Sequence, residues 1–249
     1  MKKYIGSLLV IMLFAACNRT QSPHKPLLSA DTSVDTPVDI IATVETVLSD
    51  REIKLTNAGL IDVATLDEGI MVHLVYATPY NFTGKVLYHD IRYAFLQPDV
   101  AKKLLNACKA LKMIRPDLTF IVYDAARPIS VQKEMWNLVK GTLWSYYVKN
   151  PDNGGGLHNY GAAVDLSLID STGQPLSMGT PFDYFGYEAN TDKETELVRA
   201  GRITQRELEN RLLLRKVMTE AGFRTVTSEW WHFNSCTLED AKQMYKLIE

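Results

Sequence analysis

The sequence predicts an α+β fold in which helices pack on a small, mainly antiparallel sheet. Short apolar runs rich in β-branched residues indicate strands, amphipathic stretches with start signals indicate helices, and the two kinds of element follow each other in mixed order. The chain has 249 residues, of which 46% are hydrophobic and 22% are charged. This composition is typical of a soluble globular protein with a proper core, so we expect one domain with extensions.

The first part of the domain reads as a strand, a helix and a second strand. Residues 70–77, IMVHLVYA, and residues 119–125, TFIVYDA, are apolar and rich in β-branched side chains, which is typical of strands. Between them, PDVAKKLLNACKALKMI (98–114) begins with Pro98 at a first-turn position and repeats apolar residues at helical spacing. We therefore expect an amphipathic helix there.

The middle of the domain is expected to contain a helix, a loop and a strand. Residues 131–148, VQKEMWNLVKGTLWSYYV, read as a second helix. The glycine-rich NPDNGGGLHNYG (150–161) is expected to be a loop. AAVDLSLI (162–169) alternates in polarity, which indicates a strand.

Two capping boxes mark helices in the last part of the chain. Thr204 with Glu207 precedes LENRLLLRKVMTEA, and Gly222 stands at the matching C-terminal stop. A second box at Thr237 opens a short terminal helix, LEDAKQMYKLI. EWWHF (229–233) lies between the two helices, and we interpret it as a strand.

The N-terminus has the pattern of an export signal. In residues 1–17, lysines precede a short apolar run and small residues before Cys17. FAAC resembles a bacterial lipobox, although Phe14 stands where leucine is more usual, so Cys17 is expected to carry a lipid anchor. Residues 18–40, rich in Pro, Ser, Thr and Asp, read as a flexible tether to a domain spanning 41–249. A plain signal peptide with a coincidental cysteine is the alternative.

Charge and cysteine content restrict the partners and crosslinks. The formal net charge is -2, so a nucleic acid or an anionic membrane surface is not expected as the main partner. If Cys17 is lipidated, only Cys108 and Cys236 remain, and whether they pair or stay free is left open. The anchor predicts a lipoprotein of the bacterial cell envelope on the periplasmic side, attached to the membrane through its N-terminus only.

Of the five histidines, two are candidates for a metal-binding or catalytic role. His24 lies in the tether, where a ligand could not be held rigidly. His73, in an apolar run, is more often a satisfied or edge residue than a ligand, and His89 has no acidic or histidine partner at useful spacing. His158 and His232 remain.

Each remaining histidine has a nearby carboxylate. His158 precedes Asp165 by seven residues, and in a straight strand this odd spacing would place the two side chains on opposite faces. His158 must therefore lie on the loop and Asp165 on the strand, with Gly161 allowing the chain to turn. Glu229 and His232 are three residues apart, so they can share a site only if Glu229 lies at the turn before the strand or on a bulge.

These residue types are sufficient for a zinc hydrolase site. Two histidines and one carboxylate can hold a catalytic zinc and leave its fourth position for water. A second carboxylate must then take the water's proton, and Glu229 is the candidate. Arg127, at the end of a predicted strand, could stabilise the oxyanion. Taken singly, His158, Asp165 and Glu229 could also be an ordinary loop residue, a turn residue and a surface carboxylate.

The segments HNYGAAVD and EWWHF resemble the zinc peptidase family that contains the D-alanyl-D-alanine dipeptidases of the vancomycin-resistance type. The similarity extends over nearly the whole domain, through YATPYNFTGK (76–85), YDAARP (123–128) and MGTPFDYF (178–185), in the family's order. The resemblance implies one zinc per chain, held by His158, Asp165 and His232. It also implies Glu229 as catalytic base and Arg127 as transition-state stabiliser.

The resemblance further implies a substrate pocket. Asp183 would lie near the substrate's ammonium group, while Trp230 and Trp231 would wall the pocket and exclude water. Related carboxypeptidases usually have proline at the position of Trp230, which favours the dipeptidase branch. Gly156 stands where the family commonly has serine. If that hydroxyl helps to hold the substrate carboxylate, backbone amides of the glycine run must replace it, or the substrate preference has moved.

We therefore expect zinc-dependent hydrolysis of a small D,D-dipeptide, D-Ala-D-Ala, in cell-wall metabolism. A D,D- or L,D-carboxypeptidase that trims peptidoglycan stem peptides is the nearest alternative. A non-catalytic, zinc-bearing domain that binds cell-wall peptides is the second alternative, although a spare carboxylate at Glu229 argues against it. The oligomeric state is left open.

Overall fold

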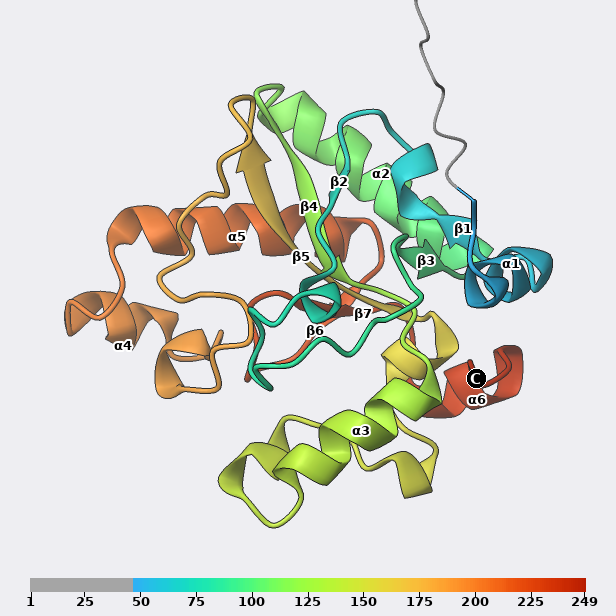
Figure 1. Ribbon diagram of the computed structural model, residues 1–249. Helices are drawn as coiled ribbons and strands as arrows, with labels where there is room; N and C mark the ends of the chain where they lie inside the picture. The colour runs from blue at the N-terminus through green and yellow to red at the C-terminus, as the bar shows by residue number, and fades with distance from the viewer. Residues whose placement is uncertain (1–46) are drawn as a thin grey trace, which may run out of the picture. The chain divides into compact units, whose positions relative to one another are not determined.

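The computed structural model describes residues 47–249 (Figure 1). The expected signal peptide, the lipidation site Cys17, the tether 18–40 and the domain boundary near residue 41 lie outside the described residues. Within 47–249, none of the helices combines the length and the apolar character that crossing a bilayer requires.

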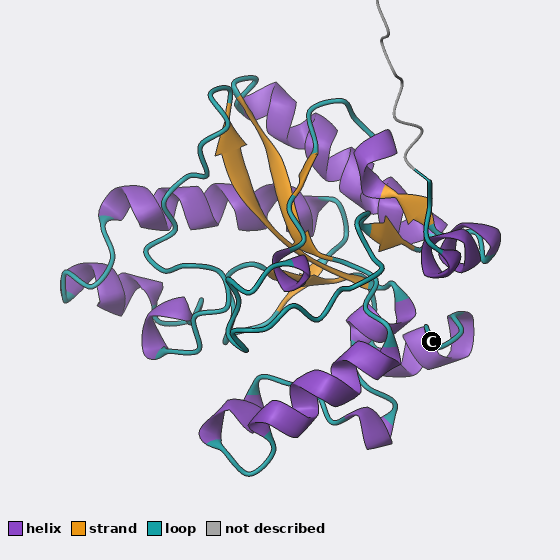
Figure 2. Cartoon of the chain, viewed as in Figure 1, coloured by secondary structure: helices purple, strands orange, loops and turns teal. Residues whose placement is uncertain are grey.

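A five-stranded sheet forms the centre of the domain (Figure 2). Only its first pair of strands is parallel, and the other three pairs are antiparallel. A separate two-stranded antiparallel sheet pairs β1 with β3. The predicted α+β class is confirmed. In spatial order the five strands are β2 (Met71–Val72), β4 (Leu118–Asp124), β5 (Ala163–Asp170), β7 (His232–Asn234) and β6 (Arg224–Thr225), and the small sheet has β1 (Ile61–Asp62) and β3 (Phe95–Leu96).

The longer helices start where their capping signals predict. Pro98 opens the helix after β3, and the Thr204 and Thr237 capping boxes are both formed. The α-helices are α1 (Asp50–Asn57), α2 (Pro98–Ile114), α3 (Ile129–Val139), α4 (Glu194–Arg199), α5 (Gln205–Glu220) and α6 (Leu238–Met244). Short 3-10 helices are η1 (Val63–Thr65), η2 (Val75–Ala77), η3 (Leu143–Tyr146), η4 (Pro151–Asn153), η5 (Leu157–Tyr160) and η6 (Tyr187–Ala189).

The two faces of the central sheet differ in what they pack against. On β5, Val164, Leu166 and Leu168 are fully buried in the main hydrophobic core, to which α2 and α5 also contribute. Because side chains alternate along a strand, Asp165 lies on the opposite face. On β7, Phe233 likewise joins the core, so its neighbours on that strand face the same side as Asp165. One face therefore anchors the sheet and the other is available for polar groups.

Four predicted elements are shorter than expected. Of the strand predicted for 229–233, only His232 and Phe233 belong to a strand, β7. In 70–77 only Met71–Val72 form a strand, because Leu74, Val75 and Tyr76 are all buried instead of alternating, and the chain turns into the 3-10 helix η2 from Val75. The helix predicted for 131–148 ends at Val139, since the chain turns at Gly141, where φ is +81°. The terminal helix ends at Met244.

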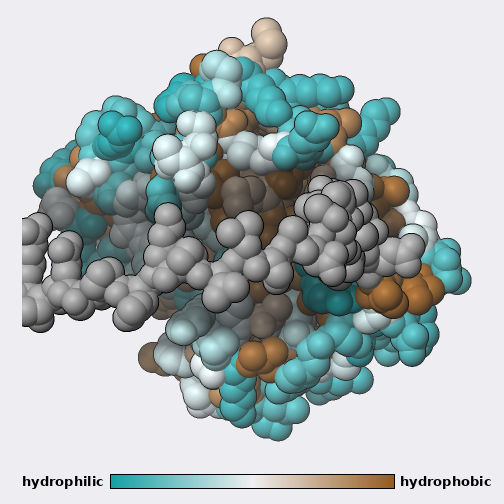
Figure 3. Space-filling model, turned by 45° about the horizontal axis from the view of Figure 1, so that its top comes forward, coloured by the Kyte–Doolittle hydropathy of each residue, from teal (hydrophilic) through white to brown (hydrophobic). Residues whose placement is uncertain are grey.

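The surface is mixed in polarity. In Figure 3, hydrophilic residues cover much of the visible face, and hydrophobic residues gather in smaller areas between them. The exposed large hydrophobic side chains include Leu143, Tyr146 and Tyr80. Leu143 and Tyr146 lie together on η3 with the exposed Trp144, whereas Tyr80 lies in a separate segment.

Candidate metal centre

Three side chains from separate segments meet on the polar face of the sheet. His158 lies on η5, Asp165 on β5 and His232 on β7, where Asp165 and His232 are paired across the two antiparallel strands. Gly161 ends η5 with φ +65°, a left-handed conformation that glycine adopts at little cost. As the odd spacing between His158 and Asp165 requires, the histidine lies before the strand and the aspartate within it.

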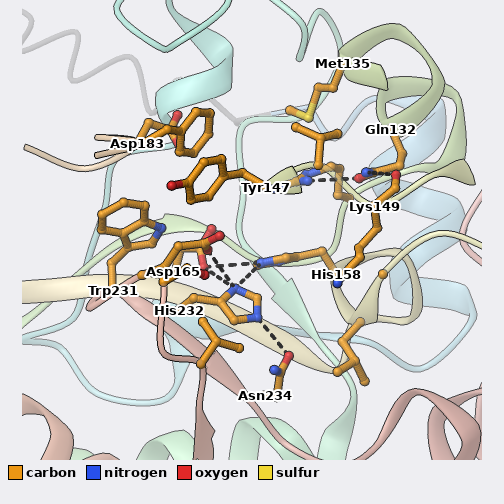
Figure 4. Close-up of a pocket in the computed structure, with 18 of the residues that line it drawn as sticks. Gln132, Met135, Tyr147, Lys149, His158, Asp165, Asp183, Trp231, His232 and Asn234 are labelled. Carbon is orange, nitrogen blue, oxygen red and sulfur yellow. Dashed lines mark hydrogen bonds and ion pairs between the residues drawn. The ribbon is translucent and has the colours of Figure 1, made fainter. Parts of the chain in front are cut away.

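The inner atoms of this triad are close enough to share one metal ion (Figure 4). His158 Nε2 lies 3.2 Å from His232 Nδ1 and 3.3 Å from Asp165 Oδ1. His232 Nδ1 lies 2.8 Å from Asp165 Oδ1. Ligand atoms about 2.0–2.1 Å from a tetrahedral zinc are about 3.3 Å apart, so the three side chains fit this metal with little movement.

The outer nitrogen of each histidine is already engaged. His158 Nδ1 donates to the carbonyl oxygen of Ala125 over 2.7 Å, and His232 Nε2 donates to Asn234 Oδ1 over 2.8 Å. These hydrogen bonds leave the inner nitrogens, His158 Nε2 and His232 Nδ1, with their lone pairs toward the common point, as in metal sites whose outer partners orient the ligands. Asn234 was not predicted, although it lies two residues after His232 and so on the same face of β7.

The protonation behaviour of the triad reflects the close approach of its charges. Burial alone would raise the pKa of Asp165, but the neighbouring His158 and His232 hold it well below its usual value. Burial alone would lower the pKa of His232, but the negative charge of Asp165 raises it to about 9. A metal at this site therefore competes with a proton on His232.

Glu229 lies beside the triad without joining it. It is positioned at the turn before β7, as its spacing from His232 requires, and its Oε2 is 4.0 Å from His232 Nδ1. Its side chain is 16% exposed and lines the same cavity as the triad. Burial raises the pKa of Glu229, which increases its affinity for a proton.

Arg127 reaches the cavity from the segment after β4. Its Nε and Nη2 donate to Asp124 Oδ2, and its Nη1 donates to Gln132 Oε1 over 2.9 Å. The guanidinium carbon lies 5.1 Å from the centre of the Tyr76 ring. A guanidinium has five N–H donors, so three of them orient Arg127 and two remain for a ligand. Asp124 and Gln132 were not predicted, because nothing in their local sequence marks them as its partners.

Asp183 provides a further carboxyl group in the cavity, with one oxygen that has no partner within the described residues. It is the one non-glycine residue with positive φ (+59°) within 47–249, and its Oδ1 accepts from the Tyr76 hydroxyl over 3.0 Å. Its Oδ2 is buried and has no hydrogen-bond partner within the described residues. Burial raises the pKa of Asp183 well above its usual value, and the charge of Asp165 adds to the shift. A cationic ligand group would satisfy this oxygen.

The two tryptophans of EWWHF have different surroundings, and only one of them lines the cavity. Trp231 is 1% exposed and lines the cavity, as predicted. Trp230 does not line it: its indole Nε1 donates to Thr180 Oγ1 over 2.7 Å, and its ring borders a different, shallower hollow. The prediction that both tryptophans wall the pocket is therefore wrong for Trp230, because neighbouring residues in this turn point to opposite sides.

The remaining expectations concern residues outside the triad. His73 and His89 are exposed and hold no place in the site. Cys108 and Cys236 are free, so the two thiols that the sequence left unassigned are not paired.

Gly156 lines the cavity, but its N–H already donates to Asn159 Oδ1 over 2.8 Å. This amide is therefore not free to replace a serine hydroxyl.

A triad of two histidines and one carboxylate, with a separate buried carboxylate beside it and a cavity of about 380 Å³ in front, defines the class of metal-dependent hydrolases. Comparison with known proteins narrows the class. A family model described as D-ala-D-ala dipeptidase matches residues 56–247. The chain belongs to this family, peptidase family M15, and is a peptidase.

Individual relatives agree with the family match. The chain is 32% identical to a D-alanyl-D-alanine dipeptidase of Escherichia coli over 174 residues, which cover 70% of this chain and 83% of that protein. It is 34% identical to a D-alanyl-D-alanine dipeptidase of Enterococcus faecium over 192 residues, which cover 68% of this chain and 88% of that protein. The resemblance inferred from the sequence motifs is confirmed.

Proposed function

We propose that this protein hydrolyses the D-Ala-D-Ala dipeptide with the help of one zinc ion and acts in cell-wall metabolism. The observation that carries the proposal is the meeting of His158, Asp165 and His232 around one point, with the carboxylate of Glu229 outside this triad and 4.0 Å from His232 Nδ1. A purely structural zinc site would need no such carboxylate. The names of the relatives support the choice of dipeptide.

The inner atoms of the triad would hold the metal. When bound there, zinc supplies a Lewis acid that lowers the pKa of a coordinated water to about 7. Glu229 accepts the proton of the attacking water and passes it to the leaving amine, a role that its raised pKa favours. Arg127 offers its two remaining N–H donors to the oxyanion that develops on the scissile carbonyl.

The other charged groups bind the substrate. Asp183 Oδ2, buried and unpaired, receives the ammonium group of the dipeptide. Trp231 and the stacked rings of Tyr147 and Phe185, whose centroids are 4.5 Å apart, border the cavity and restrict its size. A free dipeptide, which carries its ammonium group one residue from the scissile bond, matches a pocket with a carboxylate at this place.

The substrate class can be tested by direct comparison. Zinc-loaded protein is incubated with D-Ala-D-Ala and, separately, with a pentapeptide stem that ends in D-Ala-D-Ala, and released D-alanine is measured. We expect turnover of the dipeptide and much slower release from the stem. Faster release from the stem would identify a carboxypeptidase, and no turnover of either would identify a binding domain.

Replacing Arg127 by lysine should lower turnover about 100-fold or more, the usual cost of one lost oxyanion donor. Lysine keeps the positive charge but loses the planar set of donors that holds Asp124, Gln132 and the oxyanion together. KM should change less than kcat, because the contact strengthens in the transition state. Arg115→Lys, at an exposed ion pair, is the control. Near wild-type turnover of Arg127→Lys would contradict this role.

We further propose that the protein is a lipid-anchored component of the bacterial cell envelope, held at the membrane through Cys17 and facing the periplasm. Changing Cys17 to serine should move the protein from the membrane fraction to the soluble fraction, because the acylated residue is lost. Fractionation followed by immunodetection measures this, with Cys236→Ser as the control that keeps the anchor. Unchanged membrane association of Cys17→Ser would refute the proposed anchor.

A further inference from the structure

We propose that Lys149 binds the C-terminal carboxylate of the dipeptide and so selects substrates with a free C-terminus. This inference rests on the proposed function and assigns a residue to the end of the substrate opposite to Asp183. Lys149 lies between η3 and η4, in a segment that the sequence analysis did not connect with the site. It lines the same cavity as the triad.

Lys149 is the basic residue of this cavity whose charged group is uncommitted within the described residues. The cavity is lined by the carboxylates of Asp165, Asp183 and Glu229, and by two basic side chains, Arg127 and Lys149. Three N–H donors of Arg127 are committed to Asp124 and Gln132, and the other two are assigned to the oxyanion. The ammonium group of Lys149 forms no hydrogen bond or ion pair within residues 47–249. With the Arg127 donors assigned to the oxyanion, a substrate carboxylate that enters this pocket has the ammonium group of Lys149 as its positive partner.

The main chain of Lys149 is tied to the catalytic groups. Gln132, which is buried, donates from Nε2 to the carbonyl oxygen of Lys149 over 2.8 Å and accepts from Arg127 Nη1 at its other end. The position of Lys149 is thus coupled through one side chain to the guanidinium that faces the scissile carbonyl. A flexible lysine side chain gains precision when its backbone is fixed in this way.

Gly156 provides the space for the stem of Lys149. A Cβ atom added to Gly156 would lie 3.2 Å from Lys149 Cγ, which is tighter than most such contacts, and 3.5 Å from its Cβ, an ordinary van der Waals contact. The lysine stem therefore packs across the bare glycine backbone at the cavity wall. Because the Gly156 N–H is occupied by Asn159, the amide beneath the stem does not compete for the carboxylate.

Asp183, the triad and Lys149 occupy different parts of one cavity wall, in an order that suits a dipeptide. In Figure 4, Asp183 and Lys149 lie on opposite sides of the triad formed by His158, Asp165 and His232. A zwitterionic dipeptide with its ammonium group at Asp183 places its peptide bond at the triad and its carboxylate toward Lys149. The order of charges along the cavity wall matches the order of charges along the substrate.

The test compares substrates that differ only at the C-terminus. Wild type, Lys149→Met and Lys140→Met are assayed with D-Ala-D-Ala and with its C-terminal amide. Lys140 is the matched control, because it is exposed, lies nine residues before Lys149 and bonds to Asn137 away from the cavity. Thermal melting of each variant verifies that folding is unchanged.

We expect Lys149→Met to raise KM for D-Ala-D-Ala about tenfold with little change in kcat, the effect of losing one charge-assisted contact in the ground state and transition state alike. Its kinetics with the amide should equal those of wild type, Lys140→Met should match wild type on both substrates, and Lys149→Arg should restore most of the affinity.

Two results would overturn the inference while the proposed function stands. The first is an active Lys149→Met variant with wild-type KM for D-Ala-D-Ala. The second is an equal loss on the free acid and on the amide, which would indicate a general structural role. Failure of the wild type to hydrolyse either form would instead refute the proposed function, and the inference with it.

Discussion

Alanine in place of His158, Asp165 or His232 is expected to remove bound zinc and dipeptide hydrolysis together. Each side chain supplies one of three inner atoms that lie 2.8–3.3 Å apart, so two remaining ligands would leave the metal weakly held. Loss of an outer hydrogen-bond partner alone lowers metal affinity by about 10–100-fold, and loss of a ligand should cost more. Zinc content per chain, measured after dialysis, and turnover of D-Ala-D-Ala check the expectation.

Controls for the triad come from the same residue types elsewhere in the chain. His73→Ala and His89→Ala remove exposed histidines and should keep both zinc and activity. Asn234→Ala removes the oxygen that accepts from His232 Nε2 and should weaken metal binding without abolishing it. Stoichiometric zinc in all three triad variants would show that the ligands are other residues.

Replacing Glu229 by glutamine separates metal binding from chemistry. The amide keeps the size of the side chain but cannot accept the water's proton, so zinc should stay bound while kcat falls by about 10²–10⁴-fold, the usual contribution of a general base. KM should change little, since the interaction strengthens in the transition state. Zinc content and kcat are measured on the same preparation, with Glu220→Gln, an exposed glutamate, as control. A near wild-type kcat would mean that Glu229 is only part of a well-packed turn.

Local signals predicted the helices well. The Thr204 and Thr237 boxes begin helices because a hydroxyl and a carboxylate three residues apart satisfy backbone donors without help from the rest of the fold. The secondary structure of residues 70–77 was harder to predict, because an apolar run indicates burial but does not distinguish a strand from a buried turn. The bounds of that segment depend on the pairing of Met71–Val72 with β4, which only the assembled sheet defines.

In the site as well, local sequence patterns predicted some features, while others depend on contacts between distant segments. Side-chain alternation along a strand placed His158 before the strand and Glu229 either at the turn before the strand or on a bulge, and the structure has His158 on η5 and Glu229 at the turn. Gln132 and Lys149 escaped prediction, since their connection to Arg127 is formed by hydrogen bonds between segments that carry no motif. Trp230 was assigned to the pocket because its neighbour belongs there, and the direction of each side chain in a turn cannot be read from adjacency.

The role of these outer residues can be understood in physical terms. Asp124, Gln132 and Asn234 touch the groups that face the cavity and hold them in one orientation, which makes the site ready before a ligand arrives. Asp183 contributes in another way, because its Oδ2 is kept buried and unpaired within the described residues. Such a group has a free-energy cost in the free enzyme that a bound ammonium group offsets.

The most direct test of a zinc-dependent dipeptidase is removal and return of the metal with one substrate. The purified protein is stripped with a chelator, dialysed, and titrated with zinc while D-Ala-D-Ala hydrolysis is followed. We predict that turnover disappears in the stripped protein and returns in proportion to added zinc, with a plateau at one zinc per chain. Undiminished hydrolysis by protein shown to be free of metal, or no hydrolysis at any zinc content, would contradict the account.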